Sequence, residues 1–184
     1  MMSLAEMPDN ELMKMLAGRK SESEAAFREI YARYSQRIYA YCHRVLDYSE
    51  ESNDIYQDTF VKFFETYKQN LNVSNIRGML IRIARNLCLN YKRDSKYSIE
   101  FDEMKMPVYD KSFDDDELVD LIAKAVKMLD FEHREAFVLR NYEGMSYQEI
   151  GEILGQNVST IRNRVVRAKE KIKEILQPYL EELE

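Results

Sequence analysis

The sequence has few of the residues that make turns: five glycines and three prolines in 184 residues, or about 4% of the chain. A typical chain holds about 12% of the two together. Sandwiches, barrels and disordered chains need more of them, whereas helices joined by short links need few. The chain is 45% apolar and 33% charged, which leaves enough apolar material for a core. The composition therefore favours an all-α fold.

Long apolar runs and reactive-site signatures are also missing. The longest stretch without a charged residue is Ile153–Ile161, far below the roughly 18 to 20 apolar residues that cross a bilayer. The N-terminal region is acidic and has no apolar segment typical of a secretory signal. Cys42 and Cys88 form no C-x-x-C pair, so we interpret them as buried, reduced thiols. We expect a soluble, cytoplasmic protein with no membrane insertion.

The sequence also lacks catalytic motifs. The sequence has no P-loop, no nucleophile–base motif and no Cys or His spacing that suits a metal. The acidic run Asp114–Glu117 is more typical of a first helical turn than of a metal site. We therefore expect no catalytic residues, no metal and no cofactor.

Charge is unevenly distributed along the chain. Lys and Arg number 27 and Asp and Glu 33, which gives a net charge of −6. Residues 77–96 carry six cations and one anion, residues 98–120 carry nine anions and two cations, and residues 156–173 carry six cations and one anion. Taken whole, a net negative charge speaks against a simple nucleic-acid binder, which is usually basic. The segregation into two basic blocks separated by an acidic one is nevertheless informative, although any single block is equally consistent with a solvated helix face.

Apolar residues recur at three- and four-residue steps in several segments. This periodicity predicts helices over residues 23–46, 52–69 and 75–93, after a short one near Leu12–Leu16, and Ser21-x-x-Glu24 suggests a capping box before the first long helix. Residues 96–116 are acidic and without period, which is typical of a flexible linker. We predict a helical domain over 9–95, a linker over 96–116 and a second helical domain over 117–180.

The second domain contains a helix-turn-helix pattern. Ser146-x-x-Glu149 is a capping box for one helix, Gly155 suits the sharp turn after it, and Asn157 suits the N-cap of the next helix. Gly151 lacks a side chain where two such helices would cross closely. The spacing of these residues predicts helix, short turn, helix, as in many DNA-binding proteins.

The second helix of this pattern has an outward side suited to DNA. Arg donates two hydrogen bonds to guanine and Asn pairs with adenine in the major groove. On this reasoning the candidate base readers are Arg162, Asn163, Val166 and Arg167. The candidate phosphate contacts are Thr160, Arg164, Lys169 and Lys171. An ordinary helical hairpin with a basic face is the alternative.

Four motifs in order along the chain resemble a known family. They are Ala26-Phe27-x3-Tyr31-x2-Tyr34, Asp54–Phe60, Ile81–Asn86, and Met145–Ile150 with its continuation through Arg167-Ala168. Over about residues 9–176 the sequence resembles the extracytoplasmic-function (ECF) sigma factors of the bacterial sigma-70 family. The resemblance implies two helical domains, sigma region 2 and sigma region 4, that bind core RNA polymerase and read the minus-10 and minus-35 elements of promoter DNA. It also implies an anti-sigma factor partner, no catalysis, and a monomer when free.

The resemblance also implies roles for particular residues. The implied polymerase contacts are Asp54, Gln57 and Asp58, where the family often has Glu at the last position. The implied minus-10 contacts, part of a pocket for a flipped base, are Asn70, Asn72, Ser74, Asn75, Arg82, Asn86, Asn90 and Lys92. The implied minus-35 contacts are Thr160, Arg162, Asn163, Arg164, Val166, Arg167 and Lys169. The family usually has Trp near Met79 or Leu80, and this chain has none.

Two other functions remain open from the sequence. A conventional helix-turn-helix regulator would use residues 1–95 to sense a signal or dimerise, and would bind a palindromic operator with half-sites about one DNA turn apart. A sigma factor would act as a monomer on an asymmetric, two-part site. A helical interaction protein without a nucleic-acid role would tolerate the loss of Arg162 and Arg167.

Overall fold

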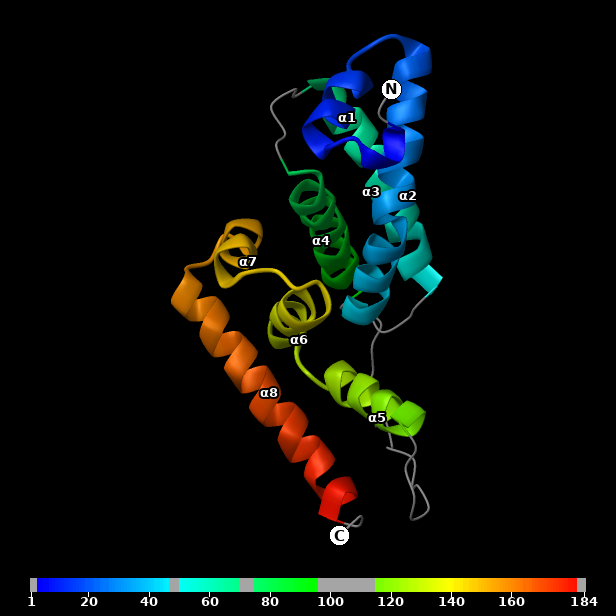
Figure 1. The fold of residues 1–184 in the computed structure, drawn as a ribbon. Coiled ribbons are helices and arrows are strands. Elements are labelled where there is room, and N and C mark those ends of the chain that lie inside the picture. The colour runs from blue at the N-terminus through cyan, green and yellow to red at the C-terminus, as the bar shows by residue number, and fades with distance from the viewer. Residues whose placement is uncertain (1–2, 47–49, 70–74, 96–114, 182–184) are drawn as a thin grey trace. The chain divides into compact units, whose positions relative to one another are not determined.

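The computed structural model describes residues 3–46, 50–69, 75–95 and 115–181, and every regular element in these ranges is helical (Figure 1). The elements are η1 (Leu4–Glu6), α1 (Asp9–Leu16), α2 (Lys20–Val45), α3 (Glu50–Gln69), α4 (Ile76–Ser95), α5 (Asp115–Lys127), α6 (Phe131–Phe137), the π-helical turn η2 (Val138–Tyr142), α7 (Tyr147–Leu154) and α8 (Val158–Glu181). The all-α prediction is confirmed for this part of the chain. None of these helices is both long and apolar enough to cross a membrane.

The chain divides into two compact units, Met1–Asp94 and Ser95–Glu184. Residues 96–114 of the predicted linker lie outside the described residues. Asp115 and Asp116, which we assigned to the linker, already belong to the first turn of α5.

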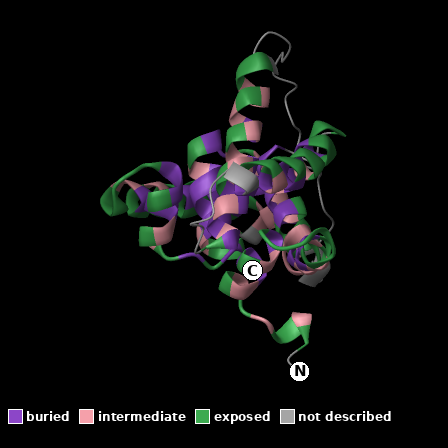
Figure 2. Cartoon of the chain, turned by 90° about the horizontal axis from the view of Figure 1, so that it is seen from above, coloured by how far each residue is buried: buried purple, intermediate pink, exposed green. Residues whose placement is uncertain are grey.

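The first unit is held together by apolar stripes on its helices. Figure 2 shows buried positions interspersed with exposed ones along the helices. The large side chains with almost no exposed surface in this unit are Leu12, Ile30, Ile38, Tyr41, Phe63, Tyr67, Ile76, Leu80 and Ile81. Each contributes about 1.5 to 3 kcal/mol by leaving water. The Tyr67 hydroxyl donates to the carbonyl of Met13, so α3 is also joined to α1 by a buried hydrogen bond.

The beginning of α2 differs from the sequence prediction. The helix starts at Lys20, and the Glu22 carboxylate accepts a hydrogen bond from the backbone N–H of Arg19 at 3.0 Å. The prediction of a Ser21-x-x-Glu24 capping box is therefore wrong. Glu22 stands at the third helical position after Arg19, where a carboxylate reaches back to the free amide, so the helix gains a turn before Ser23.

One arginine fixes α1 and η1 against α2. The Arg33 guanidinium lies 2.7 Å from Glu29 Oε1 and 3.2 Å from Asp9 Oδ1, and it donates to the Leu4 carbonyl at 2.7 Å. Tyr34 donates its hydroxyl hydrogen to Asp9 as well. Burial, together with this hydrogen bond, raises the pKa of Tyr34 to about 12. The N-terminal elements are thus held by charge-assisted hydrogen bonds.

The second unit is built around α8, which packs against α5, α6 and α7. The Asp130 carboxylate caps α6 by accepting from the backbone N–H of His133 at 3.2 Å. Arg134, which is buried, donates to the Leu129 carbonyl at 2.9 Å in the link between α5 and α6. After η2, Gly144 adopts a φ of +66° and turns the chain toward α7, as expected for a helix-stopping glycine.

Candidate nucleic-acid interface

The helix-turn-helix begins with the capping box that the sequence predicts. Ser146 Oγ accepts from the Glu149 N–H at 3.2 Å, and Glu149 Oε2 accepts from the Ser146 N–H at 2.8 Å. α7 then runs for two turns and ends at Gly155, whose φ of +65° lies in the left-handed region. Residues other than glycine rarely adopt this conformation. Both predictions are confirmed.

The turn brings α7 and α8 into close contact. Gly151 is buried, and a Cβ atom there would lie 2.7 Å from the carbonyl oxygen of Gln156. Asn157 Oδ1 accepts from the Thr160 N–H and from Ser159 Oγ, both at 2.7 Å, and so caps α8. The predicted close crossing and the predicted N-cap are therefore both confirmed. The geometry is that of a helix-turn-helix with α8 as the second helix.

The two sides of α8 differ sharply. The buried side consists of Ile161, Val165, Ala168, Ile172 and Leu176. The exposed candidates for DNA contact are Arg162, Asn163, Val166, Arg167 and Lys169. Val166 is 46% exposed, and an apolar side chain among basic ones suits contact with a thymine methyl group. The structure thus brings five of the seven residues implied for the minus-35 element together on solvent-exposed positions, and the phosphate candidate Lys171 is exposed as well.

The other two residues of this set are placed differently. Arg164 Nη2 lies 2.5 Å from Glu132 Oε2, and the Arg164 side chain is only 17% exposed. Thr160 is half-buried and its backbone N–H is bound to Asn157. Arg164 therefore links α8 to α6 within the unit. Sequence spacing alone does not reveal this pair, since 32 residues separate its members.

The predicted minus-10 residues fall largely on one side of α4. Arg82, Asn86 and Asn90 are exposed and follow each other at intervals of four residues, which places them on one helix face. Arg93 continues this face three residues later, is exposed, and lies 3.2 Å from Asp94. Arg93 was not among the residues predicted for this site, although its spacing from Asn90 is typical of the same helix face.

The remaining minus-10 candidates have other positions. Asn75 precedes α4, and its Oδ1 accepts from the Gly78 N–H at 2.8 Å, so the side chain caps the helix. Lys92 is half-buried and falls on a different side of α4 from Asn86 and Asn90. Asn70, Asn72 and Ser74 lie outside the described residues.

The predicted polymerase contacts lie on α3. Asp54, Gln57 and Asp58 are exposed one turn apart, so they form one face of the helix. Val61 extends this face and is 56% exposed. It borders a groove of about 570 Å³ whose apolar lining residues are Phe27, Val61 and Phe64. An acidic and amide surface beside an apolar groove has the character of a protein-binding face.

Together these features define a class of protein: a helical protein of two units, one with an acidic, partly apolar face on α3 and an amide-rich face on α4, the other with a helix-turn-helix whose outer side is basic. Family models give this class a name. Sigma-70 region 2 matches residues 30–97, and sigma-70 region 4 matches residues 120–172. The chain belongs to the sigma-70 family of RNA polymerase sigma factors, in its ECF group.

The similarity to individual relatives covers most of the chain. It is 29% identical over 167 residues to RNA polymerase sigma factor YlaC of Bacillus subtilis, covering 85% of this chain and 95% of that protein. It is also 29% identical over 162 residues to ECF RNA polymerase sigma factor SigE of Mycolicibacterium smegmatis, covering 84% of this chain. The match spans 63% of the length of that second protein.

Two solved structures of similar fold are complexes with other proteins. CnrH in complex with the cytosolic domain of CnrY has a TM-score of 0.67 at 25% identity, over 92% of this chain and 97% of the solved one. RpoE in complex with the anti-sigma factor NepR, from Bartonella quintana, has a TM-score of 0.66 at 23% identity, over 82% and 96%. At 23% identity, the similarity to the Bartonella quintana RpoE shows a shared fold alone.

Proposed function

We propose that this protein is a sigma factor that binds core RNA polymerase and directs it to promoters with a minus-10 and a minus-35 element. The observation that carries the proposal is a helix-turn-helix with an exposed basic side on α8, in a chain whose two units match sigma regions 2 and 4. The family membership favours this function over a dimeric regulator. The protein itself performs no covalent chemistry, and it acts in the cytoplasm, where polymerase and chromosomal DNA are found.

The α3 face is proposed to bind the polymerase. Asp54 and Asp58 present two carboxylates one turn apart, with Gln57 between them, to a basic partner surface. Truncating a central residue of such an interface costs about 1 to 2 kcal/mol or more. Asp58 is shorter than the Glu common in the family, so its carboxylate reaches less far from the helix.

The α4 face is proposed to bind the minus-10 strand. Opening a promoter requires a base to be held outside the stack, at a cost of a few kcal/mol. The amides of Asn86 and Asn90 offer both donors and acceptors to a base edge, while Arg82 is suited to the backbone. Asn70, Asn72, Ser74, Asn75 and Lys92 are proposed to complete this site, with Asn75 also capping α4.

The exposed side of α8 is proposed to read the minus-35 element. Arg162, Asn163, Val166 and Arg167 would contact bases, and Lys169 a phosphate. Each wrong base pair costs only about 1 to 3 kcal/mol, so one small unit selects poorly. Two DNA-binding units on one chain bind more tightly together than either does alone, because once the polymerase fixes their spacing the second unit binds at a high effective concentration.

An anti-sigma factor is the further proposed partner. RpoE of Bartonella quintana was solved with an anti-sigma factor, and CnrH with the cytosolic domain of CnrY. By analogy we propose that this chain, a monomer when free of polymerase, is also held by a regulatory protein until it is released.

Polymerase binding offers a direct test. The double variant Asp54→Ala/Gln57→Ala should bind core polymerase from the same organism at least about tenfold more weakly, with unchanged helical content by circular dichroism. The matched control is Gln36→Ala/Arg37→Ala, which changes two exposed residues of α2. Equal affinity of the wild type and the α3 variant, or an equal loss in the control, would rule out the α3 face.

A further inference from the structure

Two arginines converge on one aromatic ring beside the base-reading residues. The Arg140 guanidinium carbon lies 4.7 Å from the centroid of the Tyr147 ring, and that of Arg162 lies 5.6 Å from the same centroid. Both distances fall within the roughly 6 Å range of cation–π attraction. Arg140 belongs to η2, Tyr147 to α7 and Arg162 to α8, so the stack joins three elements of the second unit.

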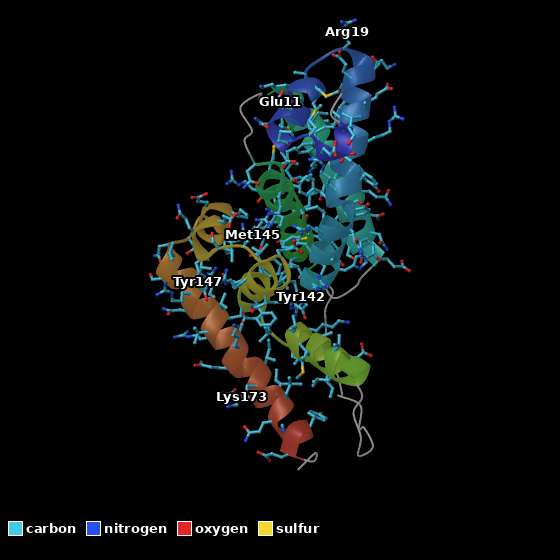
Figure 3. The ribbon with its side chains drawn as sticks, viewed as in Figure 1. Glu11, Arg19, Tyr142, Met145, Tyr147 and Lys173 are labelled. Atoms are coloured by element: carbon cyan, nitrogen blue, oxygen red, sulfur yellow. The ribbon has the colours of Figure 1, made fainter. Side chains whose placement is uncertain are left out.

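The ring itself is held in place from two directions. Tyr147 is the first residue of α7, directly after Ser146, and the capping box with Glu149 fixes that turn. Arg140 is anchored too, because its Nη1 donates to the Met145 carbonyl at 2.7 Å. Figure 3 shows the labelled residues Met145 and Tyr147 on this part of the unit. Of the three side chains in the stack, Arg162 is the exposed one.

We propose that Tyr147 is a positioning residue for sequence recognition: together with Arg140, its ring orients the Arg162 guanidinium before DNA is bound. The proposal rests on the proposed function of α8 as the minus-35 reader. Arg162 stands in the N-terminal part of α8, the part of a recognition helix that contacts base edges. A bidentate contact from Arg to guanine needs a defined guanidinium plane.

The physical advantage lies in side-chain entropy. A free arginine samples many rotamers, and ordering it on binding is costly. A ring face that already restricts the guanidinium lowers this cost, but only for the base pair that Arg162 reads. A residue that merely packed α7 against α8 would affect all positions of the minus-35 element alike. The two roles therefore differ in their effect on sequence selectivity.

The test uses the complete protein with core polymerase and a promoter library randomised in the minus-35 hexamer, read out by sequencing the transcripts. Arg162→Ala identifies the base pair that Arg162 reads, where we expect preference to fall about tenfold or more. Tyr147→Leu should lower preference at that same base pair about three- to fivefold and leave the other five positions unchanged. Tyr147→Phe keeps the ring and should behave as the wild type.

A double variant sharpens the test. In the Arg162→Ala background, Tyr147→Leu should have no further effect on selectivity, because the residue acts through Arg162. Arg140→Met leaves the Tyr147 ring unchanged but removes the second cation over it, together with the hydrogen bond from Arg140 to the Met145 carbonyl. This variant should therefore reduce preference at the same base pair. It also supplies a second variant if Tyr147→Leu does not fold.

The results of this experiment distinguish failure of the positioning role of Tyr147 from failure of the proposed sigma function. Uniform loss over the hexamer in both the Tyr147→Leu and the Arg140→Met variants, or unchanged selectivity in both, would overturn the positioning role while the wild type still selects a motif. If the wild-type protein selects no motif at all, the proposed sigma function fails first, and the role of Tyr147 fails with it.

Discussion

Arg164 offers a sharp test, because it lies on α8 among the candidate DNA contacts but is bound inside its own unit. Its Nη2 lies 2.5 Å from Glu132 Oε2 on α6, with side-chain exposures of 17% and 64%. We predict that Arg164→Gln loosens the contact between α8 and α6 and leaves the affinity for promoter DNA and its salt dependence unchanged. The interpretation of Arg164 as a phosphate contact predicts weaker binding to every sequence and a flatter salt dependence.

The expected loss of stability in Arg164→Gln follows from how far the two side chains of the ion pair are exposed. Ion pairs with a solvent-exposed partner contribute about 0.2 to 1 kcal/mol, and Glu132 is well exposed. The half-buried stem of Arg164 adds packing that glutamine replaces only in part. We expect a loss of about 1 kcal/mol, equivalent to about a fivefold rise in local opening. Glu132→Gln should cost about half as much, with a coupling of about 0.5 kcal/mol in the double variant.

Two measurements on the complete protein check this prediction. Hydrogen exchange should show faster exchange at the amides of α6 and the neighbouring turns of α8 in Arg164→Gln and in Glu132→Gln. Promoter binding by the polymerase complex, measured against salt concentration, should keep its slope in both variants. A slope flatter by about one unit in Arg164→Gln alone, with weaker binding to every sequence, would refute the reasoning.

Two further predictions concern the stability of the second unit. Gly151→Val should destabilise it by more than about 2 kcal/mol, since even a Cβ would meet the Gln156 carbonyl at 2.7 Å. Urea unfolding checks this. Gly144→Ala is the comparison variant for backbone strain, because a Cβ at Gly144 meets no neighbouring atom within 4 Å but the residue has a φ of +66°. Burial alone would raise the pKa of Asp130, but hydrogen bonds and charge from His133 lower it overall. The native state therefore binds this proton more weakly than the unfolded chain does. The contribution of ionised Asp130 to the free energy of unfolding is present above about pH 4 and is lost as the pH falls through the lowered pKa. Asp130→Asn, which keeps a capping oxygen, should reduce this loss of unfolding free energy between about pH 5 and 3, and an unchanged pH profile would contradict it.

The parts of the fold that sequence predicts best are those set by local chemistry. The capping box at Ser146, the left-handed turn at Gly155 and the cap at Asn157 each depend on residues within three positions of one another. Apolar periodicity likewise placed the three long helices α2, α3 and α4, because one buried stripe defines each of them. In the described residues the errors lie at helix ends, as at the start of α2, where Glu22 accepts from the Arg19 N–H and the predicted pair of Ser21 and Glu24 does not form the cap.

The candidate site was harder to predict wherever distant side chains meet. Sequence shows that Arg162 and Arg164 are both basic and close together on α8. It does not show that one faces Tyr147 and the other Glu132, since these contacts depend on how the helices pack. The double role proposed for Asn75 was missed for a different reason, because a DNA-binding amide and a capping amide have the same sequence signature.

The measurement that tests the account most directly is transcription in vitro with purified core polymerase and genomic DNA from the same organism. We expect that adding this protein produces a reproducible set of start sites that share a two-part upstream element, and that Arg162→Ala/Arg167→Ala abolishes most of them. The same start sites with and without the protein would contradict it.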